Sequence, residues 1–72
     1  MTNNYKIGDR IRIVQMGNPD EQRLNGCEGM IIGMFGPFID VTLDNDEYNL
    51  FEDIDYENTK YVILIESEIE KI

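Results

Sequence analysis

Two runs of β-forming residues flank the dipeptide Gly36-Pro37, and they constrain the fold of this chain more than any other feature. The first run, EGMIIGMF, spans residues 28–35, and the second, FIDVTL, spans residues 38–43. Apolar and polar residues alternate in the second run, which is typical of a strand with one buried face. Glycine and proline between two such runs favour a tight turn. We therefore predict a β-hairpin, with Gly29 and Gly33 allowing its first strand to bend or bulge.

Three more segments have the composition of strands. Residues 5–13 alternate between Tyr or Ile and basic residues, apart from the step at Gly8-Asp9. Residues 60–65, KYVILI, form a β run that is buried on both faces or that caps a barrel. Glu66-Ser67-Glu68 interrupts this run, and residues 69–72 then form a short closing strand. The pattern predicts a sheet of short strands.

The two remaining segments separate these strands. Residues 17–26, GNPDEQRLNG, have the composition of a loop, and Leu24 is the one residue that we expect to anchor it. Residues 45–59, NDEYNLFEDIDYENT, are the hardest to interpret, because carboxylates alternate irregularly with apolar residues. We expect part of this segment to be a strand and part a helical turn.

The order of segments resembles that of small SH3-like barrels of the KOW type. The resemblance is carried by GDRIRIVQM, NGCEGMIIG and FIDVTLDN within residues 8–45, where one glycine ends the loop and a second follows shortly before a β run. The ending, YVILIESEIEKI, is similar to the last strand, 3₁₀ turn and closing strand of such barrels. The chain also resembles an uncharacterised group of short bacterial and phage proteins. The resemblance implies one all-β domain over residues 1–72, a five-stranded SH3-like barrel with a 3₁₀ turn before the last strand.

The amino-acid composition narrows the classes of function. The chain has no histidine, the usual general base and the commonest metal ligand. Its one cysteine, Cys27, has neither a disulfide partner nor a histidine to activate it, and we interpret it as structural. No apolar run is long enough to span a bilayer or to form a signal peptide. We expect a cytoplasmic, non-enzymatic protein without a metal, a cofactor or a membrane partner.

The charge is distributed unevenly along the chain. The net charge is −9, and residues 1–30 contain as many basic as acidic residues. The excess therefore belongs to residues 31–72, and seven carboxylates fall within residues 44–57. A calcium loop of the EF-hand type does not fit, because Tyr48 and Asn49 occupy a ligand position and the required glycine position. The segment is either a solvated loop that keeps the domain soluble or an acidic surface for a basic partner.

We predict that the acidic segment is a protein-binding surface, because aromatic residues among charged ones are typical of interfaces. The protein would then be a non-catalytic binding module, a monomer or weak homodimer, that docks on a basic protein. One way to do so is to imitate the phosphates of nucleic acid. The predicted protein-binding residues are Asp46, Glu47, Tyr48, Phe51, Glu52, Asp53, Asp55 and Tyr56.

Two alternatives stay open for the rest of the chain. The KOW resemblance implies weak RNA or DNA binding, for which the candidate residues are Arg10, Arg12 and Arg23, although the net charge disfavours it. Arg10 and Arg12 could instead pair across the sheet with acids such as Asp40 or Asp44. The apolar residues that either fill the core or form an adaptable contact surface are Met16, Met30, Met34, Phe35 and Phe38.

Overall fold

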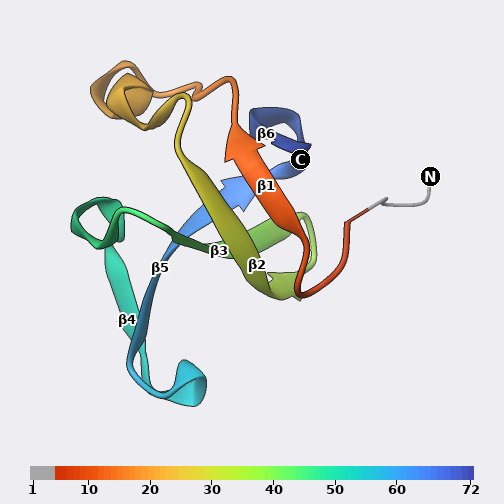
Figure 1. Ribbon diagram of the computed structural model, residues 1–72, viewed down its shortest axis with the longest axis vertical. Helices are drawn as coiled ribbons and strands as arrows, with labels where there is room; N and C mark the ends of the chain where they lie inside the picture. The colour runs from red at the N-terminus through yellow and green to blue at the C-terminus, as the bar shows by residue number, and fades with distance from the viewer. Residues whose placement is uncertain (1–4) are drawn as a thin grey trace.

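The computed structural model describes residues 5–72, apart from the side chains of Asp53 and Ile54. Six strands form one open antiparallel sheet in the order β4-β5-β3-β2-β1-β6 (Figure 1). The strands are β1 (Arg10–Ile13), β2 (Glu28–Phe35), β3 (Phe38–Leu43), β4 (Phe51–Asp53), β5 (Thr59–Ile65) and β6 (Ile69–Lys71). The prediction of an all-β domain is confirmed. The predicted count of five strands is wrong, because β4 pairs with β5 and adds an edge strand to the sheet.

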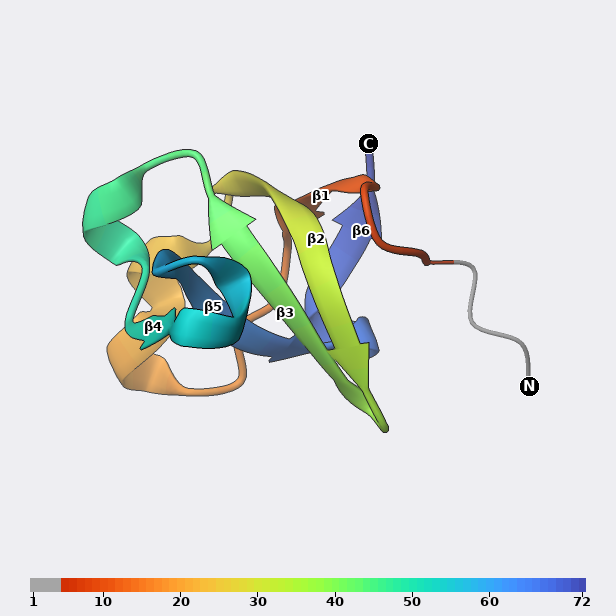
Figure 2. The ribbon, with the colours of Figure 1, turned by 90° about the horizontal axis from the view of Figure 1, so that it is seen from below.

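The β2–β3 hairpin has the bounds that the sequence predicts. Gly36 has a φ of +59°, and Pro37 follows it, which fits a two-residue type II′ turn. The pairing register shifts between Ile31 and Gly33, so the predicted bulge is present in β2. The bulge bends β2, and Figure 2 shows the β2–β3 hairpin crossing in front of the other strands.

The first strand is shorter than predicted. It begins at Arg10 because residues 6–9 form a turn, in which the amide of Asp9 donates to the carbonyl of Lys6 (3.1 Å). Gly8 in this turn has a φ of +99°, which a residue with a side chain rarely adopts. Ile7 is 65% exposed, so its predicted place on the buried face is wrong.

The segment predicted to be a loop, residues 17–26, contains a 3₁₀ helix, η1 (Pro19–Leu24). The Asn18 side chain accepts a hydrogen bond from the amide of Asp20 and thereby caps the helix, and Pro19 stands at its first turn. Leu24 is only 1% exposed. The anchoring role predicted for Leu24 is therefore confirmed. The prediction that residues 17–26 form a loop without regular structure is wrong, because η1 lies within them.

The other predicted turns are also 3₁₀ turns. Residues 45–59 contain η2 (Asp46–Tyr48), β4 and η3 (Ile54–Tyr56), which agrees with the predicted mixture of strand and helical turn. The turn predicted before the last strand is η4 (Glu66–Glu68). Among residues 5–72, no helix is long and apolar enough to cross a membrane.

The core lies inside the curved sheet, where one side chain in two points inward along β1, β3 and β5. Half-buried Tyr5, Cys27, Met34 and Tyr48 pack against it. The buried apolar residues are Ile11, Ile13, Met16, Leu24, Ile31, Ile39, Val41, Leu43, Val62, Leu64 and Ile69. Because this core uses the inner faces only, the outer faces of the same strands are free to carry a site.

Candidate functional site

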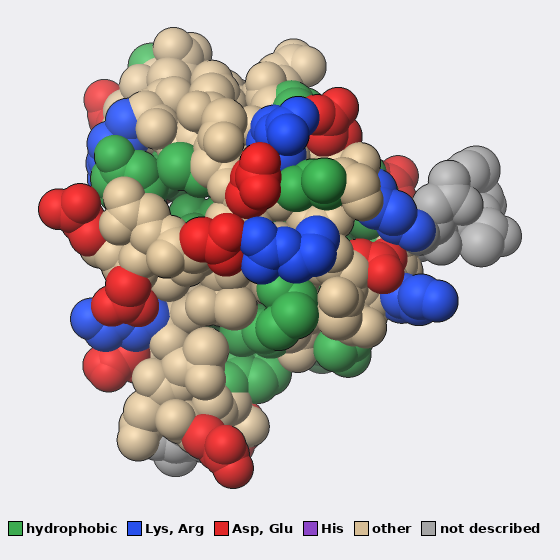
Figure 3. All heavy atoms as spheres, viewed as in Figure 1, with side chains coloured by type: hydrophobic (Ala, Val, Ile, Leu, Met, Phe, Trp, Pro, Cys, Tyr) green, Lys and Arg blue, Asp and Glu red, His purple; other side chains and the backbone are tan. Residues whose placement is uncertain are grey.

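Ion pairs neutralise the two arginines of β1. The Arg10 guanidinium donates to both carboxylate oxygens of Asp44, at 3.0 and 2.5 Å. Arg12 lies opposite Glu28 on β2 and Glu70 on β6, and it donates to these two carboxylates at 3.3 and 3.1 Å. Figure 3 shows basic and acidic side chains next to each other across this face. The cross-sheet pairing predicted with Asp44 is therefore confirmed.

The third predicted arginine, Arg23, belongs to a different part of the molecule. Its guanidinium donates to the backbone carbonyl of Asp20 within η1 (2.8 Å). The same group lies 5.9 Å from the centroid of the Tyr48 ring, which is a cation–π arrangement. Arg10 and Arg12 thus share one network with carboxylates, and Arg23 makes its contacts on η1.

Hydrogen bonds from Arg10 lower the pKa of the Asp44 carboxyl below its ordinary value. Because this pKa is lower in the folded than in the unfolded protein, the stability that Asp44 contributes is complete above about pH 3.9. It is lost as the pH falls through the folded-state pKa. We expect Arg10→Gln to raise the Asp44 pKa toward its ordinary value, measured by NMR titration of the carboxyl carbons. Arg23→Gln is the control and should leave the Asp44 pKa unchanged; an equal rise would contradict the assignment.

The predicted acidic residues lie on three elements, η2, β4 and η3. Asp46 and Glu47 are exposed on η2, and Asp46 lies 3.8 Å from the Lys60 ammonium group. Glu52 on β4 and Asp55 on η3 are exposed on the arm formed by β4, η3 and the start of β5, which extends away from β1 and β6 in Figure 1. The predicted residue Asp53 is also on β4, but its side chain lies outside the described part of the structure.

The predicted aromatic residues also lie in two different parts of the structure. Tyr48 is half-buried against the core, beneath Arg23. Phe51 and Tyr56 instead both contact Tyr61 of β5: the ring centroids of Phe51 and Tyr61 are 5.6 Å apart, and those of Tyr56 and Tyr61 are 5.4 Å apart, edge to face. The Tyr56 hydroxyl donates to the Asp40 carboxylate of β3 (2.7 Å). Tyr56, Tyr61 and Asp40 therefore form one cluster on the outer face of the sheet.

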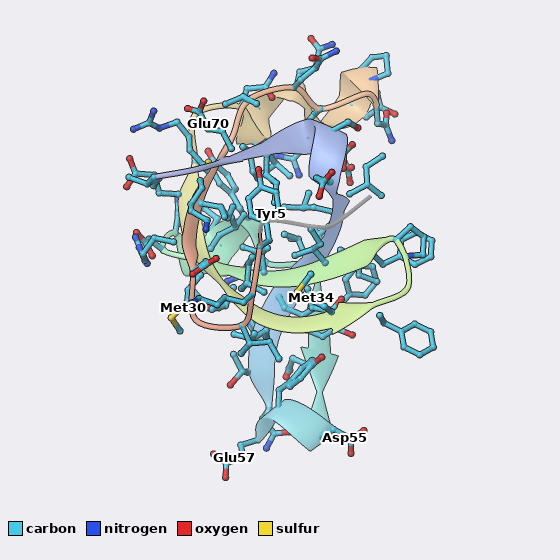
Figure 4. The ribbon with its side chains drawn as sticks, turned by 90° about the vertical axis from the view of Figure 1, so that its right-hand side faces the viewer. Tyr5, Met30, Met34, Asp55, Glu57 and Glu70 are labelled. Atoms are coloured by element: carbon cyan, nitrogen blue, oxygen red, sulfur yellow. The ribbon has the colours of Figure 1, made fainter. Side chains whose placement is uncertain are left out.

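This cluster lines a groove of about 380 Å³ on the outer face of β3 and β5. We call it the aromatic groove, and its residues are Met34, Phe35, Phe38, Asp40, Tyr56, Tyr61 and Ile63. Phe35 is 79% exposed and Phe38 is 46% exposed. Figure 4 shows Met34 on the β2–β3 hairpin and shows Asp55 and Glu57 at the tip of the arm. Of the two interpretations of the Met and Phe residues, a contact surface therefore fits Phe35 and Phe38.

Local backbone geometry creates the groove. Ile39 and Val41 of β3 point into the core, so that Phe38 and Asp40, which alternate with them, face outward. Gly33 lies opposite Asp40, and a Cβ atom on Gly33 would collide with the Tyr56 hydroxyl. A glycine at this position therefore lets the Tyr56 side chain lie against the sheet.

Sequence reasoning missed several members of this site. The alternation in β3 was a usable signal for the outward direction of Asp40, but Tyr61 was assigned only to a buried β run. A smaller hollow of about 190 Å³ is lined by Phe51 and by residues of η1 and β5. The aromatic groove is the larger of these two, and it places a carboxylate, that of Asp40, beside two tyrosine rings.

Two further features bear on chemistry. Cys27 is half-buried, and burial raises the pKa of its thiol, so the reactive thiolate is disfavoured at neutral pH. Among the side chains that the structure describes, no group of three or more Cys, Asp or Glu is placed to hold a metal ion. Comparison of the chain with protein-family models, with curated proteins and with solved structures finds no match. The functional argument therefore depends on the geometry of the site.

Proposed function

We propose that this protein is a non-catalytic binding module that docks an acidic, aromatic-bearing surface on a basic protein partner. The observation that carries the proposal is the aromatic groove, which is open to solvent beside an acidic arm. Exposure of aromatic side chains to water is unfavourable in free energy, and protein interfaces bury such side chains as anchors inside a polar rim. A cytoplasmic location and a monomeric or weakly dimeric state stay predictions.

The charge balance supports a basic partner. Ion pairs within the described chain already use Arg10, Arg12, Lys60 and Lys71. The net charge is −9, so most carboxylates have no basic residue to balance them. An excess of one sign of charge attracts partners of the opposite sign and accelerates their association.

The acidic arm lies where such a partner would meet the groove. Tyr56 belongs to η3 on the arm and also lines the groove, so the two surfaces are continuous. Exposed carboxylates on the arm belong to Glu52, Asp55 and Glu57. An aromatic centre with charged residues at its edge is the usual arrangement of an interface, in which the centre supplies affinity and the edge supplies selectivity.

We also propose that the fold is a variant of the SH3-like barrel. The curved sheet and the placement of η4 between β5 and β6 support this relation. The proposed variant differs from the predicted five-stranded barrel by the extra strand β4 at one edge of the sheet.

Nucleic-acid binding through Arg10, Arg12 and Arg23 is the rival function, and it has less support. A guanidinium that already binds a carboxylate must give up that ion pair before it can bind a phosphate. Arg10 and Arg12 both have such ion pairs. The rival predicts that removing acidic residues strengthens binding to DNA or RNA.

The test is a triple variant of the arm, Glu52→Gln, Asp53→Asn and Asp55→Asn. We expect it to bind a fluorescent 15-residue peptide of Lys, Arg, Leu and Tyr roughly five- to tenfold more weakly than the unsubstituted protein in low salt. The measurement is fluorescence anisotropy at low and at moderate salt, with a DNA duplex and a single-stranded RNA as competing probes.

A matched triple variant removes the same charge elsewhere: Asp20→Asn, Glu21→Gln and Glu66→Gln. We expect this control to weaken peptide binding much less. Equal weakening by both variants would show that net charge alone attracts the peptide and would contradict a binding surface on the arm. Binding of the nucleic-acid probes in preference to the peptide would favour the rival function.

A further inference from the structure

We propose that the aromatic groove binds an arginine side chain of the protein partner, with Asp40 as the anion that receives its guanidinium. This inference rests on the proposed function, since it specifies which chemical group of a basic partner enters the groove. It places the recognition at one carboxylate on β3, separate from the exposed carboxylates of the arm.

No cation of the described chain pairs with the Asp40 carboxylate. It is half-buried, and its oxygen Oδ2 accepts a hydrogen bond from the Tyr56 hydroxyl at 2.7 Å. Within residues 5–72, no Lys or Arg nitrogen lies within 4.0 Å of it. By contrast, Asp44, at the end of the same strand, is held by Arg10. A carboxylate among apolar side chains is stabilised when a cation joins it.

The aromatic side chains around Asp40 favour a guanidinium over other cations. Tyr56 and Tyr61 meet edge to face beside Asp40, and Phe38 lies two residues before it on the same face of β3. A guanidinium is planar, weakly hydrated and able to stack on aromatic rings while it donates to a carboxylate. The Tyr56 hydroxyl binds Oδ2 of Asp40, and within the described part of the chain no donor reaches Oδ1, so this oxygen can accept from a ligand in the groove. The groove therefore matches the charged end and the apolar stem of arginine.

Charge also favours a basic partner over a second copy of the chain as the occupant of the groove. Exposed Phe35, Phe38 and Ile63 would suit an apolar dimer contact, but a second copy would bring a net charge of −9 toward a surface that is already acidic. The arginines of that copy would also have to leave their own carboxylates or the Tyr48 ring. A basic partner meets neither obstacle.

The test uses two peptides that differ by one charge. In the first, Ac-Ile-Arg-Ile-NH₂, arginine is flanked by apolar residues, and in the second, citrulline replaces arginine with a neutral side chain of nearly the same shape. We expect the arginine peptide to bind roughly tenfold more tightly, because it alone forms a charge-assisted hydrogen bond to Asp40. Shifts of backbone amide NMR signals, followed during titration, give both the affinity and the location, which we expect on β3, β5 and η3.

Variants of the protein locate the anion. Asp40→Asn retains an acceptor for the Tyr56 hydroxyl, and we expect it to bind the two peptides equally. Asp20→Asn removes the same charge from η1 and should preserve the preference for arginine. Equal binding of the two peptides by the unsubstituted protein would overturn the inference without any variant, and so would signal shifts confined to β1 or η2.

The outcomes also separate this inference from the proposed function. If the arm triple variant weakens binding of the basic 15-residue peptide and Asp40→Asn does not, the acidic surface stands and the arginine site is wrong. If neither change affects that peptide, both ideas are wrong. Self-association that Phe35→Ser abolishes, measured by analytical ultracentrifugation, would show that a second copy occupies the groove and would overturn the inference.

Discussion

Replacing Leu24 by alanine is expected to lower the free energy of unfolding by about 2–5 kcal/mol. Leu24 is the buried residue of η1, and it holds the connection between β1 and β2 against the core. Alanine would leave a cavity beneath the helix, which neighbouring side chains fill only in part. A domain of this size has little stability to spare, so we expect a measurable unfolded population at 37 °C.

Urea denaturation followed by tyrosine fluorescence or circular dichroism measures this change. Gln22→Ala is the control, because Gln22 is exposed on the same helix and its backbone carbonyl still accepts the amide of Asn25. We expect the control to change stability by less than about 0.5 kcal/mol. A loss below about 1 kcal/mol for Leu24→Ala would show that η1 contributes little to the core.

Replacing Gly29 by alanine is the second change for which we expect a large effect. A Cβ atom on Gly29 would lie 2.5 Å from the Thr42 carbonyl oxygen and 3.0 Å from the Leu43 Cα atom. Both are backbone atoms of the paired strand β3, so no side-chain rotation relieves the collision. We expect β2 and β3 to move apart at this point, at a cost of about 1–3 kcal/mol in the free energy of unfolding.

The same denaturation experiment measures this cost, with Gly17→Ala as the matched control. No atom lies within 4 Å of a Cβ atom on Gly17, and its φ is not in the left-handed region. The control should therefore be neutral or slightly stabilising, by up to about 1 kcal/mol. Equal stability of the two variants would contradict the close approach of β2 and β3 at Gly29.

The sequence predicts β2 and β3 well because two independent signals agree. β3 alternates apolar and polar residues, β2 is a β-forming run, and the Gly36-Pro37 turn between them favours the same hairpin. The alternation extends to Ile7 in the first segment, yet Ile7 is exposed. The turn at Gly8 breaks the register there, and an apolar residue outside a strand is not held in the core by periodicity.

Residues 45–59 show where such prediction fails. β4 and β5 are connected by η3 and then by Glu57 and Asn58, whose φ values are 60° and 65°. Glycine is the residue that most often adopts such φ values, so Glu-Asn is a weak sequence signal for this turn. β4 itself is short, and its pairing with β5 stabilises it more than its own composition does. Local sequence patterns therefore could not predict the register of β4.

The candidate site, too, could be predicted only in part from the sequence. The sequence alone determined that the second half of the chain is acidic, and the alternation in β3 placed Asp40 opposite to the core residues. Only the tertiary structure brought Asp40 beside Tyr56 and Tyr61, because these residues meet through the pairing of β3 with β5 and the absence of a side chain at Gly33. Composition and periodicity act along the chain and determine charge and strand direction, whereas contacts between distant residues depend on the pairing and curvature of the whole sheet.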